Sequence, residues 1–256
     1  MGVLDDFRLD GKVALVTGAA RGLGQGIATG LAEAGADIAG LDVASLEETG
    51  ELVENEGRRF HAMNVDLLEI DAGLAAAVVE ECAGSLGRLD ILVNNAGIIR
   101  RAPAIEFAEE DWESVIKINL SAAFYLSQAA ARHYAAEGRG GKIINTASVL
   151  SYEGGIVVPS YSASKAGIAN LTRALANEWA SLGINVNAIA PSYFTTELTS
   201  ALREDAERSE ALLARLPAGR FGEPEDLKGA VVFLASNASD YVHGTVLPVD
   251  GGWLAR

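Results

Sequence analysis

Short apolar runs alternate with helix-length amphipathic stretches along nearly the whole chain. The runs are rich in Val, Ile, Leu and Ala, a composition typical of strands that are buried on both faces. The predicted strands are Lys12–Thr17, Asp37–Asp42, Leu89–Asn94, Lys142–Thr146 and Asn185–Ala190, with a weaker one at Arg59–Asn64 and a last apolar run at Thr245–Val249.

The stretches between these runs carry apolar residues at helical spacing. They are Gly24–Ala34, Ser45–Glu56, Glu69–Leu86, Asp111–Glu137, Tyr161–Ser181 and Pro224–Leu234. Because parallel neighbouring strands need crossover connections, this alternation predicts an α/β fold: a doubly wound, Rossmann-type parallel sheet of about seven strands with helices on both faces. No repeat, low-complexity segment or linker divides the chain, so we expect residues 1–256 to form one domain.

One segment breaks the alternation. Residues Ser192–Gly222 place polar, helix-prone sequence between the sixth strand and the next helix. A connection of this length in a compact domain is typical of a lid or a binding loop. We expect it to help build a substrate pocket.

Composition narrows the class of partner. The chain has 256 residues, 49% of them apolar, a net charge of −15, a pI near 4.6 and a mean hydropathy of +0.19. Such acidity argues against binding to duplex nucleic acid or to an anionic membrane, since both need a basic surface. The start, "MGVLDDFRLDGK", has no apolar signal-like core, and no apolar run is long enough to span a bilayer, so we expect a cytoplasmic protein.

Cysteine and histidine offer no metal or thiol chemistry. Cys82 is alone and so cannot form an intramolecular disulfide, and its neighbours are typical of an ordinary helix face. We expect a buried, inert thiol rather than a nucleophile. His61, His133 and His243 are dispersed, and no metal site is expected.

A glycine-rich turn follows the first strand. In "TGAARGLG", residues 17–24, glycines at 18, 22 and 24 let backbone N–H groups approach a pyrophosphate at the start of a helix. The TG-x-x-x-G-x-G spacing is one residue longer than the usual dinucleotide fingerprint. A merely tight turn is the alternative, but the position between strand and helix favours phosphate binding.

Two carboxylates follow the next two strands. Asp42 is placed to accept hydrogen bonds from the adenosine ribose and to repel a 2′-phosphate, and it is followed by Val43 rather than by a cation. This favours NAD over NADP, although Arg21 offers a charge for a 2′-phosphate and Asp42 alternatively only begins a turn. Asp66, in "NVDL", either meets the adenine or caps a helix.

Further candidate functional residues follow the fourth and fifth strands. "NNAG", residues 94–97, ends the fourth strand either as a simple turn or beside a ligand. Tyr161 and Lys165 are four residues apart and share one face of a helix, where the lysine charge favours phenolate. Taken alone they also fit a solvated helix face. Ser148, thirteen residues before Tyr161, follows the fifth strand and can converge with them on one pocket.

These motifs, with Asn119, resemble the short-chain dehydrogenase/reductase family in order and spacing over essentially the whole chain. The resemblance implies hydride transfer between a secondary alcohol and a ketone with NAD(P). It implies that Tyr161 exchanges a proton with the substrate oxygen, that Ser148 holds that oxygen, and that Lys165 lowers the tyrosine pKa and binds the nicotinamide ribose. Asn119 would order a relay water. The implied cofactor contacts are Gly18, Arg21, Gly22, Leu23, Gly24, Asp42, Asp66, Leu67, Asn95, Ala96, Gly97, Tyr161, Lys165, Pro191, Phe194 and Thr196.

Longer segments are similar to one subfamily. "NNAGIIRR", "LPAGRFGEPEDL" and "VDGGWLAR" look like those of the 2-deoxy-D-gluconate 3-dehydrogenases, also described as 2-dehydro-3-deoxy-D-gluconate 5-dehydrogenases. This implies NAD-dependent chemistry on a sugar acid and a homotetramer built on residues 111–137, 161–181 and the C-terminal strand. Gluconate 5-dehydrogenases and 3-oxoacyl-thioester reductases share the same frame and remain alternatives. A nucleotide-sensing protein without catalysis would be expected to lack Ser148, Tyr161 or Lys165, and all three are present.

A sugar-acid carboxylate needs a cation. Arg100 and Arg101, just after NNAG, are the first candidates, with a solvated loop pair as the alternative. Glu153 is a candidate for substrate hydroxyls. Further cations, most of them expected to be solvated, are Arg203, Arg208, Arg215 and Arg220.

The chain departs from the family at Ser192. The family usually has Pro-Gly after the sixth strand, whereas this chain has Pro191 followed by Ser192. A positive φ there would strain the serine, and any other φ would let its side chain reshape the pocket. The carboxamide contacts implied for Phe194 and Thr196 depend on this turn.

Overall fold

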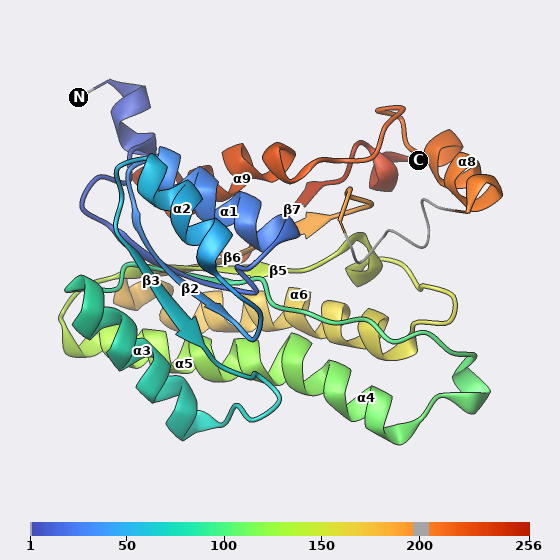
Figure 1. Cartoon of the computed structure of the whole chain (residues 1–256), viewed down its shortest axis with the longest axis horizontal. Helices are drawn as coiled ribbons and strands as arrows, with labels where there is room; N and C mark the ends of the chain where they lie inside the picture. The colour runs from blue at the N-terminus through green and yellow to red at the C-terminus, as the bar shows by residue number, and fades with distance from the viewer. Residues whose placement is uncertain (1, 197–204) are drawn as a thin grey trace.

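The computed structural model describes residues 2–196 and 205–256, and within them seven strands form one sheet through the middle of the molecule (Figure 1). The spatial order is β3-β2-β1-β4-β5-β6-β7, and each neighbouring pair is parallel. The strands are β1 Val13–Thr17, β2 Asp37–Asp42, β3 Phe60–Asn64, β4 Ile91–Asn94, β5 Gly141–Thr146, β6 Ile184–Pro191 and β7 Val246–Val249.

Helices cover both faces of this sheet, as Figure 1 shows. One face carries α1 Gly22–Glu33, α2 Glu47–Asn55 and α9 Lys228–Ala235. The other carries α3 Ala72–Leu86, α5 Ala122–Ala136 and α6 Pro159–Trp179, with α4 Glu109–Ile116 beside α6. The predicted doubly wound α/β fold is confirmed.

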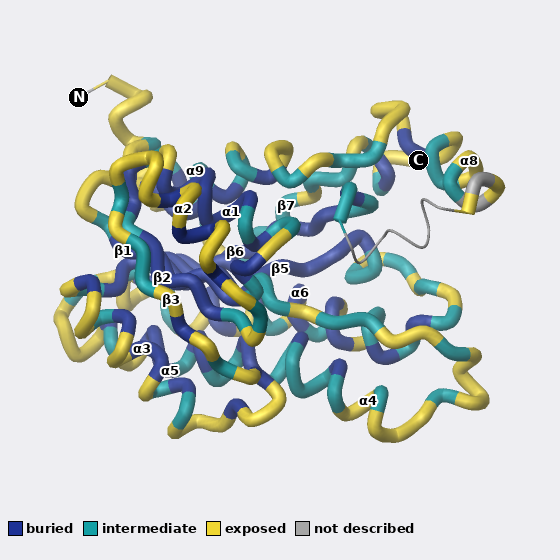
Figure 2. Tube along the Cα trace, in the orientation of Figure 1, coloured by how far each residue is buried: buried dark blue, intermediate teal, exposed yellow. Residues whose placement is uncertain are grey.

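Alternation along the strands builds two cores, one on each face. On β1, Ala14 and Val16 pack toward α1 and α9, whereas Val13 and Leu15 pack toward α3 and α5. The central strands are dark throughout in Figure 2, because both of their faces are covered. Continuous apolar runs are what this arrangement requires of a sequence.

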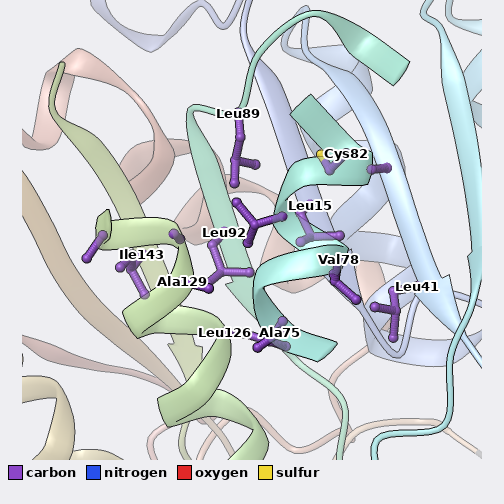
Figure 3. Close-up of a cluster of buried hydrophobic side chains, with 14 of the residues drawn as sticks. Leu15, Leu41, Ala75, Val78, Cys82, Leu89, Leu92, Leu126, Ala129 and Ile143 are labelled. Atoms are coloured by element: carbon purple, nitrogen blue, oxygen red, sulfur yellow. The ribbon is translucent and has the colours of Figure 1, made fainter. Parts of the chain in front are cut away.

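Cys82 belongs to the second of these cores. Figure 3 shows its side chain on α3, in the cluster that contains Leu15 and Leu92 of the sheet and Leu126 of α5. Burial raises the pKa of the Cys82 thiol to about 12. Since the thiolate is the reactive form, this cysteine is a packing residue.

The strand order reverses between β1 and β4. The chain leaves β1 toward β2 and β3 on one side, and it leaves β4 toward β5 and β6 on the other. Connections diverge at such a point, so the carboxyl ends of the two strands border an open crevice. The glycine turn after β1 and NNAG after β4 therefore lie side by side.

Two predicted segments differ in detail. The helix predicted over Asp111–Glu137 is divided by a π-helical turn, Lys117–Ser121, between α4 and α5. The segment Ser192–Gly222 contains a helix, α8 Ala206–Arg215, which Figure 1 places near the C-terminus. Arg203 and the side chain of Arg208 lie outside the described residues.

Neither a membrane span nor a metal cluster occurs in the described part of the chain. No helix within residues 2–196 and 205–256 is long and apolar enough to cross a bilayer. No group of three or more His, Cys, Asp or Glu side chains there is arranged to hold a metal ion.

At the amino edge of the sheet, a buried carboxylate joins three segments. Asp90, 6% exposed, accepts a hydrogen bond from Val13 N at 3.0 Å and one from Arg88 Nε at 2.7 Å. Arg139 Nη1 and Lys12 Nζ lie 3.5 and 3.7 Å from its other oxygen. This cluster fastens β1 and β4 at the end opposite the crevice.

Removing this carboxylate should destabilise the fold. Asp90→Ala leaves the Val13 N–H and three cations without their acceptor, so we expect a loss of about 2 kcal/mol in the free energy of unfolding, measured by urea denaturation. Asp10→Ala removes the exposed Arg8–Asp10 pair and should leave the midpoint unchanged. A loss below about 0.5 kcal/mol for Asp90→Ala would show that the cluster is not structural.

Candidate active site

A cavity of about 750 Å³ occupies the crevice at the carboxyl ends of β1, β2 and β4. This is within the usual range for cofactor and ligand sites. All the predicted cofactor contacts except Pro191 and Phe194 line it: Gly18, Arg21, Gly22, Leu23, Gly24, Asp42, Asp66, Leu67, Asn95, Ala96, Gly97, Tyr161, Lys165 and Thr196. Sequence motifs far apart in the chain thus meet in one place.

The glycine turn provides a cradle that side chains would fill. Gly18 and Gly22 have φ of +65° and +58°, which L-residues rarely adopt. A Cβ on Gly24 would lie 1.8 Å from Gly18 O and 2.6 Å from Asn95 Nδ2. These three positions therefore require glycine. The turn leads directly into the first turn of α1, where a phosphate is favoured. The arrangement fits a dinucleotide pyrophosphate.

A set of hydrogen bonds that we call the Thr17–Asn95 clasp joins the ends of β1 and β4. Thr17 Oγ1 accepts from Asn95 N and Ala96 N, both at 3.0 Å. In return, Asn95 Nδ2 donates to Thr17 O at 3.1 Å and to Gly18 O at 3.2 Å. NNAG is thus more than a turn, because its second amide holds the glycine turn in place.

The inner side of the glycine turn is held by residues that belong to none of the sequence motifs. Thr49 of α2, fully buried, donates to Ala19 O at 2.8 Å, and Gln25 Nε2 donates to Thr49 Oγ1 at 3.2 Å. These contacts keep the Ala19 carbonyl turned into the protein. Their only sequence signal is a polar residue on a buried helix face.

Asp42 is fixed by backbone donors at the carboxyl end of β2. Its Oδ2 accepts from Ala20 N and its Oδ1 from Ala44 N, each at 3.0 Å. The carboxylate thus begins the turn after β2, and it also lines the cavity. Two backbone donors fix its orientation, so its charge is in place before any ligand arrives.

Asp66 lines the same cavity farther along. Its Oδ1 accepts from Leu68 N at 2.9 Å. The residue that caps α3 is Asp71, whose Oδ1 accepts from Leu74 N at 2.7 Å. The helix-capping alternative for Asp66 is therefore wrong.

Tyr161 and Lys165 line the other end of the cavity, and Ser148 lies beside Tyr161 without lining it. Ser148 follows β5 and its Oγ accepts from Leu150 N at 3.1 Å, which starts the 3-10 turn Val149–Ser151. Tyr161 lies on the first turns of α6 and hydrogen-bonds Ser148, while Lys165 Nζ is 5.6 Å from the centre of the Tyr161 ring. Ser151 Oγ donates to Lys165 O at 2.6 Å and ties the serine turn to α6.

Burial shifts the pKa values of both groups on α6. It raises the pKa of Tyr161, against the opposing effects of the Ser148 hydrogen bond and the positive charge of Arg101. It lowers the pKa of Lys165 to about 8. Lys165 Nζ donates to Thr146 O at 2.6 Å. In the protein without a cofactor, the positive charge that lowers the Tyr161 pKa comes from Arg101.

Asn119 lies in the π-helical turn and is 2% exposed. Its Oδ1 accepts from Ile98 N at 2.8 Å, and its Nδ2 donates to Ile98 O at 2.9 Å and Ser164 Oγ at 3.2 Å. The side chain thus fastens the loop after NNAG to α6. A wider helical turn at this position presents the amide to both neighbours.

The two arginines after NNAG differ in their surroundings. Arg100 lines the cavity and pairs with Asp111, with 3.2 Å between Nε and Oδ1. Arg101 lies close enough to Tyr161 to lower its pKa. Ala102 N donates to Val157 O at 3.1 Å and so joins the loop of Arg101 to the loop before Tyr161.

The remaining substrate candidates have partners within the protein. Glu153 accepts from Trp253 Nε1 at 2.5 Å and from Arg215 Nη2 at 3.0 Å, and it does not line the cavity. Arg220 makes two hydrogen bonds to Asp226, at 2.6 and 2.8 Å. These contacts give Glu153, Arg215 and Arg220 structural roles.

Ser192 does not have a positive φ, so the strained alternative is excluded. Its Oγ donates to Asp250 O at 2.9 Å and ties the turn after β6 to the C-terminal segment. Pro191 pairs with Val249 in the sheet, and Phe194 is 3% exposed in the core. Neither of these two side chains reaches the cavity.

The fold and the site together define a class of protein. The sheet is doubly wound and has a glycine-lined phosphate cradle at its reversal point. A tyrosine and a lysine line the far end of the same cavity, and a serine lies beside the tyrosine. This is the framework of a nicotinamide-dependent oxidoreductase.

Comparison with known proteins agrees with this class. A family model described as Enoyl-(Acyl carrier protein) reductase matches residues 18–254. The 2-dehydro-3-deoxy-D-gluconate 5-dehydrogenase of Escherichia coli (strain K12) is 55% identical over 254 residues, 99% of this chain and 100% of the relative.

Solved structures show the same fold. One, from Agrobacterium tumefaciens, proposed to be a 2-deoxy-D-gluconate 3-dehydrogenase and solved with NADP, is 52% identical with a TM-score of 0.92, covering 98% of this chain and 100% of that one. A gluconate 5-dehydrogenase from Burkholderia cenocepacia J2315, in complex with NADP and tartrate, is 43% identical with a TM-score of 0.93, covering 100% of both chains.

The chain belongs to the short-chain dehydrogenase/reductase family, which confirms the resemblance seen in the sequence. It is an oxidoreductase that acts on a CH–OH group with a nicotinamide cofactor.

The low pKa of Lys165 predicts a pH-dependent stability. Between the folded value of about 8 and the usual 10.5, the unfolded chain holds the proton that the folded chain has released, so unfolding becomes harder as pH rises. Relative to Lys165→Met, we expect the free energy of unfolding to rise by about 2 kcal/mol from about pH 7 to about pH 9.5, measured by urea denaturation at each pH. If the difference in unfolding free energy between the two proteins stays constant with pH, the lowered pKa of Lys165 is contradicted.

Proposed function

We propose that this enzyme interconverts a secondary alcohol and a ketone on a deoxy sugar acid, with NAD as its cofactor. The observation that carries the proposal is the position of Tyr161 and Lys165 at one end of a dinucleotide-sized cavity, with Ser148 beside Tyr161 and the glycine cradle at the other end. The sugar acid is supported by the named activity of the E. coli relative, which matches this chain over its full length.

The residues that would hold the cofactor follow the cavity from end to end. The turn before α1 would take the pyrophosphate, Asp42 the adenosine ribose, and Asp66 with Leu67 the adenine. Tyr161 and Lys165 would hold the nicotinamide ribose. The remaining proposed contacts line the cavity and are Gly18, Arg21, Gly22, Leu23, Gly24, Asn95, Ala96, Gly97 and Thr196. The dinucleotide supplies the hydride chemistry.

The protein's own residues handle the proton at the substrate oxygen. Tyr161 takes this proton when the alcohol is oxidised and returns it when the ketone is reduced. Ser148, already hydrogen-bonded to Tyr161, holds the same oxygen. Burial disfavours the phenolate, and the Ser148 hydrogen bond and the positive charge of Arg101 oppose that cost. Asn119 fixes the neighbouring loop, where we place a relay water.

Arg101 is the better candidate for the substrate carboxylate. Arg101 acts on the Tyr161 side of the cleft, and the Ala102–Val157 hydrogen bond holds its loop there. A guanidinium suits a carboxylate because it can bind both oxygens at once. We therefore place the acid group of the substrate at Arg101.

We also place the enzyme in the cytoplasm as a homotetramer. A single buried cysteine suits a reducing compartment. The helices at residues 111–137 and 161–181 and the C-terminal strand are the proposed interface elements, as the family resemblance implies.

The function is tested by turnover on a substrate panel. Purified protein with NAD should oxidise 2-deoxy-D-gluconate or reduce a keto sugar acid with NADH, and it should be at least about tenfold less efficient on polyols and on 3-hydroxyacyl thioesters. Preference for a 3-oxoacyl thioester with NADPH would instead support the acyl-thioester reductase.

Tyr161→Phe should separate binding from chemistry. The ring remains in the cavity wall, so the NAD dissociation constant measured by calorimetry should stay within about twofold of the wild type, while kcat falls by about a thousandfold or more. A variant within about tenfold of wild-type kcat would sink the assignment of Tyr161.

Asp42→Asn should shift the cofactor preference. An asparagine oxygen still accepts from Ala20 N or Ala44 N, but the negative charge that repels a 2′-phosphate is gone. We expect the ratio of kcat/KM for NADP to that for NAD to rise by about tenfold or more. Asp66→Asn, a matched change at the adenine end, should leave the ratio near its wild-type value. Two solved relatives contain bound NADP. If the wild-type protein of this chain also prefers NADP, the proposed choice of NAD is wrong.

A further inference from the structure

The C-terminal turn packs into a small separate core beside the candidate active site. Trp253, in the 3-10 turn Trp253–Ala255, is 2% exposed and packs with Val149 of the serine turn and with Leu216 after α8. Partly buried neighbours complete the cluster: Tyr193, Leu212, Leu213, Phe221 and Leu254. Three segments distant in sequence therefore share one core.

Glu153 is the polar centre of this core. One carboxylate oxygen accepts from Trp253 Nε1 at 2.5 Å, and the other accepts from Arg215 Nη2 at 3.0 Å. The Arg215 guanidinium also lies over the Trp253 ring, 4.0 Å from its centre. Glu153 thus binds the last residue of α8 and the C-terminal turn at the same time, from a position five residues after Ser148.

The Trp253 contact explains why a hydrogen-bond acceptor is needed here. A buried indole N–H requires an acceptor, and Glu153 provides it. The Arg215 pair alone would matter little, since half of the arginine side chain is exposed. Together with the stacked guanidinium, the three side chains form a closed set in which each contacts the other two.

This core reaches the reacting groups by two routes. Val149 of the core follows directly on Ser148. On the other side, the Trp253 ring packs on Tyr193 with 4.8 Å between ring centres, and Tyr193 lies near enough to Tyr161 to influence its charge. A shift of the C-terminal turn is therefore transmitted to both sides of the substrate end of the cleft.

The turn that presents Trp253 is itself fixed. Asp250 accepts from Gly252 N and from Leu254 N, both at 2.9 Å, and its own carbonyl accepts from Ser192 Oγ. Ser192, the residue that departs from the family's usual glycine, thus belongs to the same set of contacts. Its hydroxyl joins the turn after β6 to the segment that carries the tryptophan.

From these contacts we infer that Glu153 is a positioning residue: it fastens α8 and the C-terminal turn to the loop that begins at Ser148, and so shapes the substrate end of the cleft. This inference rests on the proposed function for its effect on catalysis. It replaces the sequence-based expectation that Glu153 bonds substrate hydroxyls, because both of its oxygens are engaged within the protein.

Hydrogen exchange tests the fastening without reference to any reaction. Glu153→Leu removes both acceptors at similar size, and Glu153→Gln keeps an oxygen for the indole but removes the charge. In Glu153→Leu we expect exchange in peptides covering residues 206–221 and 245–256 to quicken by about fivefold or more, with a smaller change in Glu153→Gln. Peptides from Gly22–Glu33 should be unchanged in both. Glu33→Leu, which breaks a comparable pair with Lys228 at 2.7 Å between α1 and α9, is the matched control and should leave 206–221 and 245–256 unaffected.

Kinetics test what the fastening does. We expect Glu153→Leu to raise KM for the sugar acid by about tenfold while the KM for NAD stays within about twofold, and Glu153→Gln to recover most of the loss. Unchanged exchange at 206–221 and 245–256 would overturn the inference, and a raised KM with unchanged exchange would show instead that Glu153 contacts substrate. Quickened exchange with an unchanged KM would overturn the positioning role. If no sugar acid is turned over even by the wild type, the proposed function fails, and the exchange measurements still decide whether Glu153 fastens the three segments.

Discussion

The ends of β1 and β4 must pass within contact distance of each other at the point where the strand order reverses. The Thr17–Asn95 clasp provides this contact with hydrogen bonds in both directions. It leaves so little room that a Cβ on Gly18 would lie 2.8 Å from Ala96 Cα. The glycine turn, the direction in which α1 leaves it, and the depth of the crevice all follow from this approach.

The two halves of the cavity are built by different means. The nucleotide half is mostly backbone, shaped by glycines and held from behind by Thr49 and Asp42, so its chemistry is that of N–H groups and one fixed charge. The other half is made of side chains on α6 and on the turn after β5. It is joined to the sheet through Lys165 and Thr146 O, and to the loop after NNAG through Asn119.

The fold could be predicted from the sequence because strands buried on both faces leave an unambiguous apolar signal, and because α/β alternation admits few topologies. The site residues could be predicted from the order of the motifs, because Ser148 follows a strand and precedes Tyr161 and Lys165 of the next helix at a fixed spacing. Other features depend on contacts made only in the folded chain. The π-helical turn at Lys117–Ser121 has no local sequence pattern that distinguishes it from the helices on either side. The bonds of Glu153 to Trp253 and Arg215 join residues that are far apart in the sequence. At Ser192 the sequence left strain and a reshaped pocket as alternatives, and the φ of Ser192 and its bond to Asp250 show an unstrained tether.

The most direct test of this account is the NAD dissociation constant of Thr17→Val, measured by calorimetry beside Thr17→Ser. Valine keeps the shape of threonine but leaves Asn95 N and Ala96 N without their acceptor, whereas serine retains it. If the clasp organises the nucleotide half of the cavity, Thr17→Val should bind NAD about tenfold or more weakly while Thr17→Ser stays near wild type. Equal affinity for all three proteins, with the fold intact by circular dichroism, would contradict the claim that the site depends on this contact.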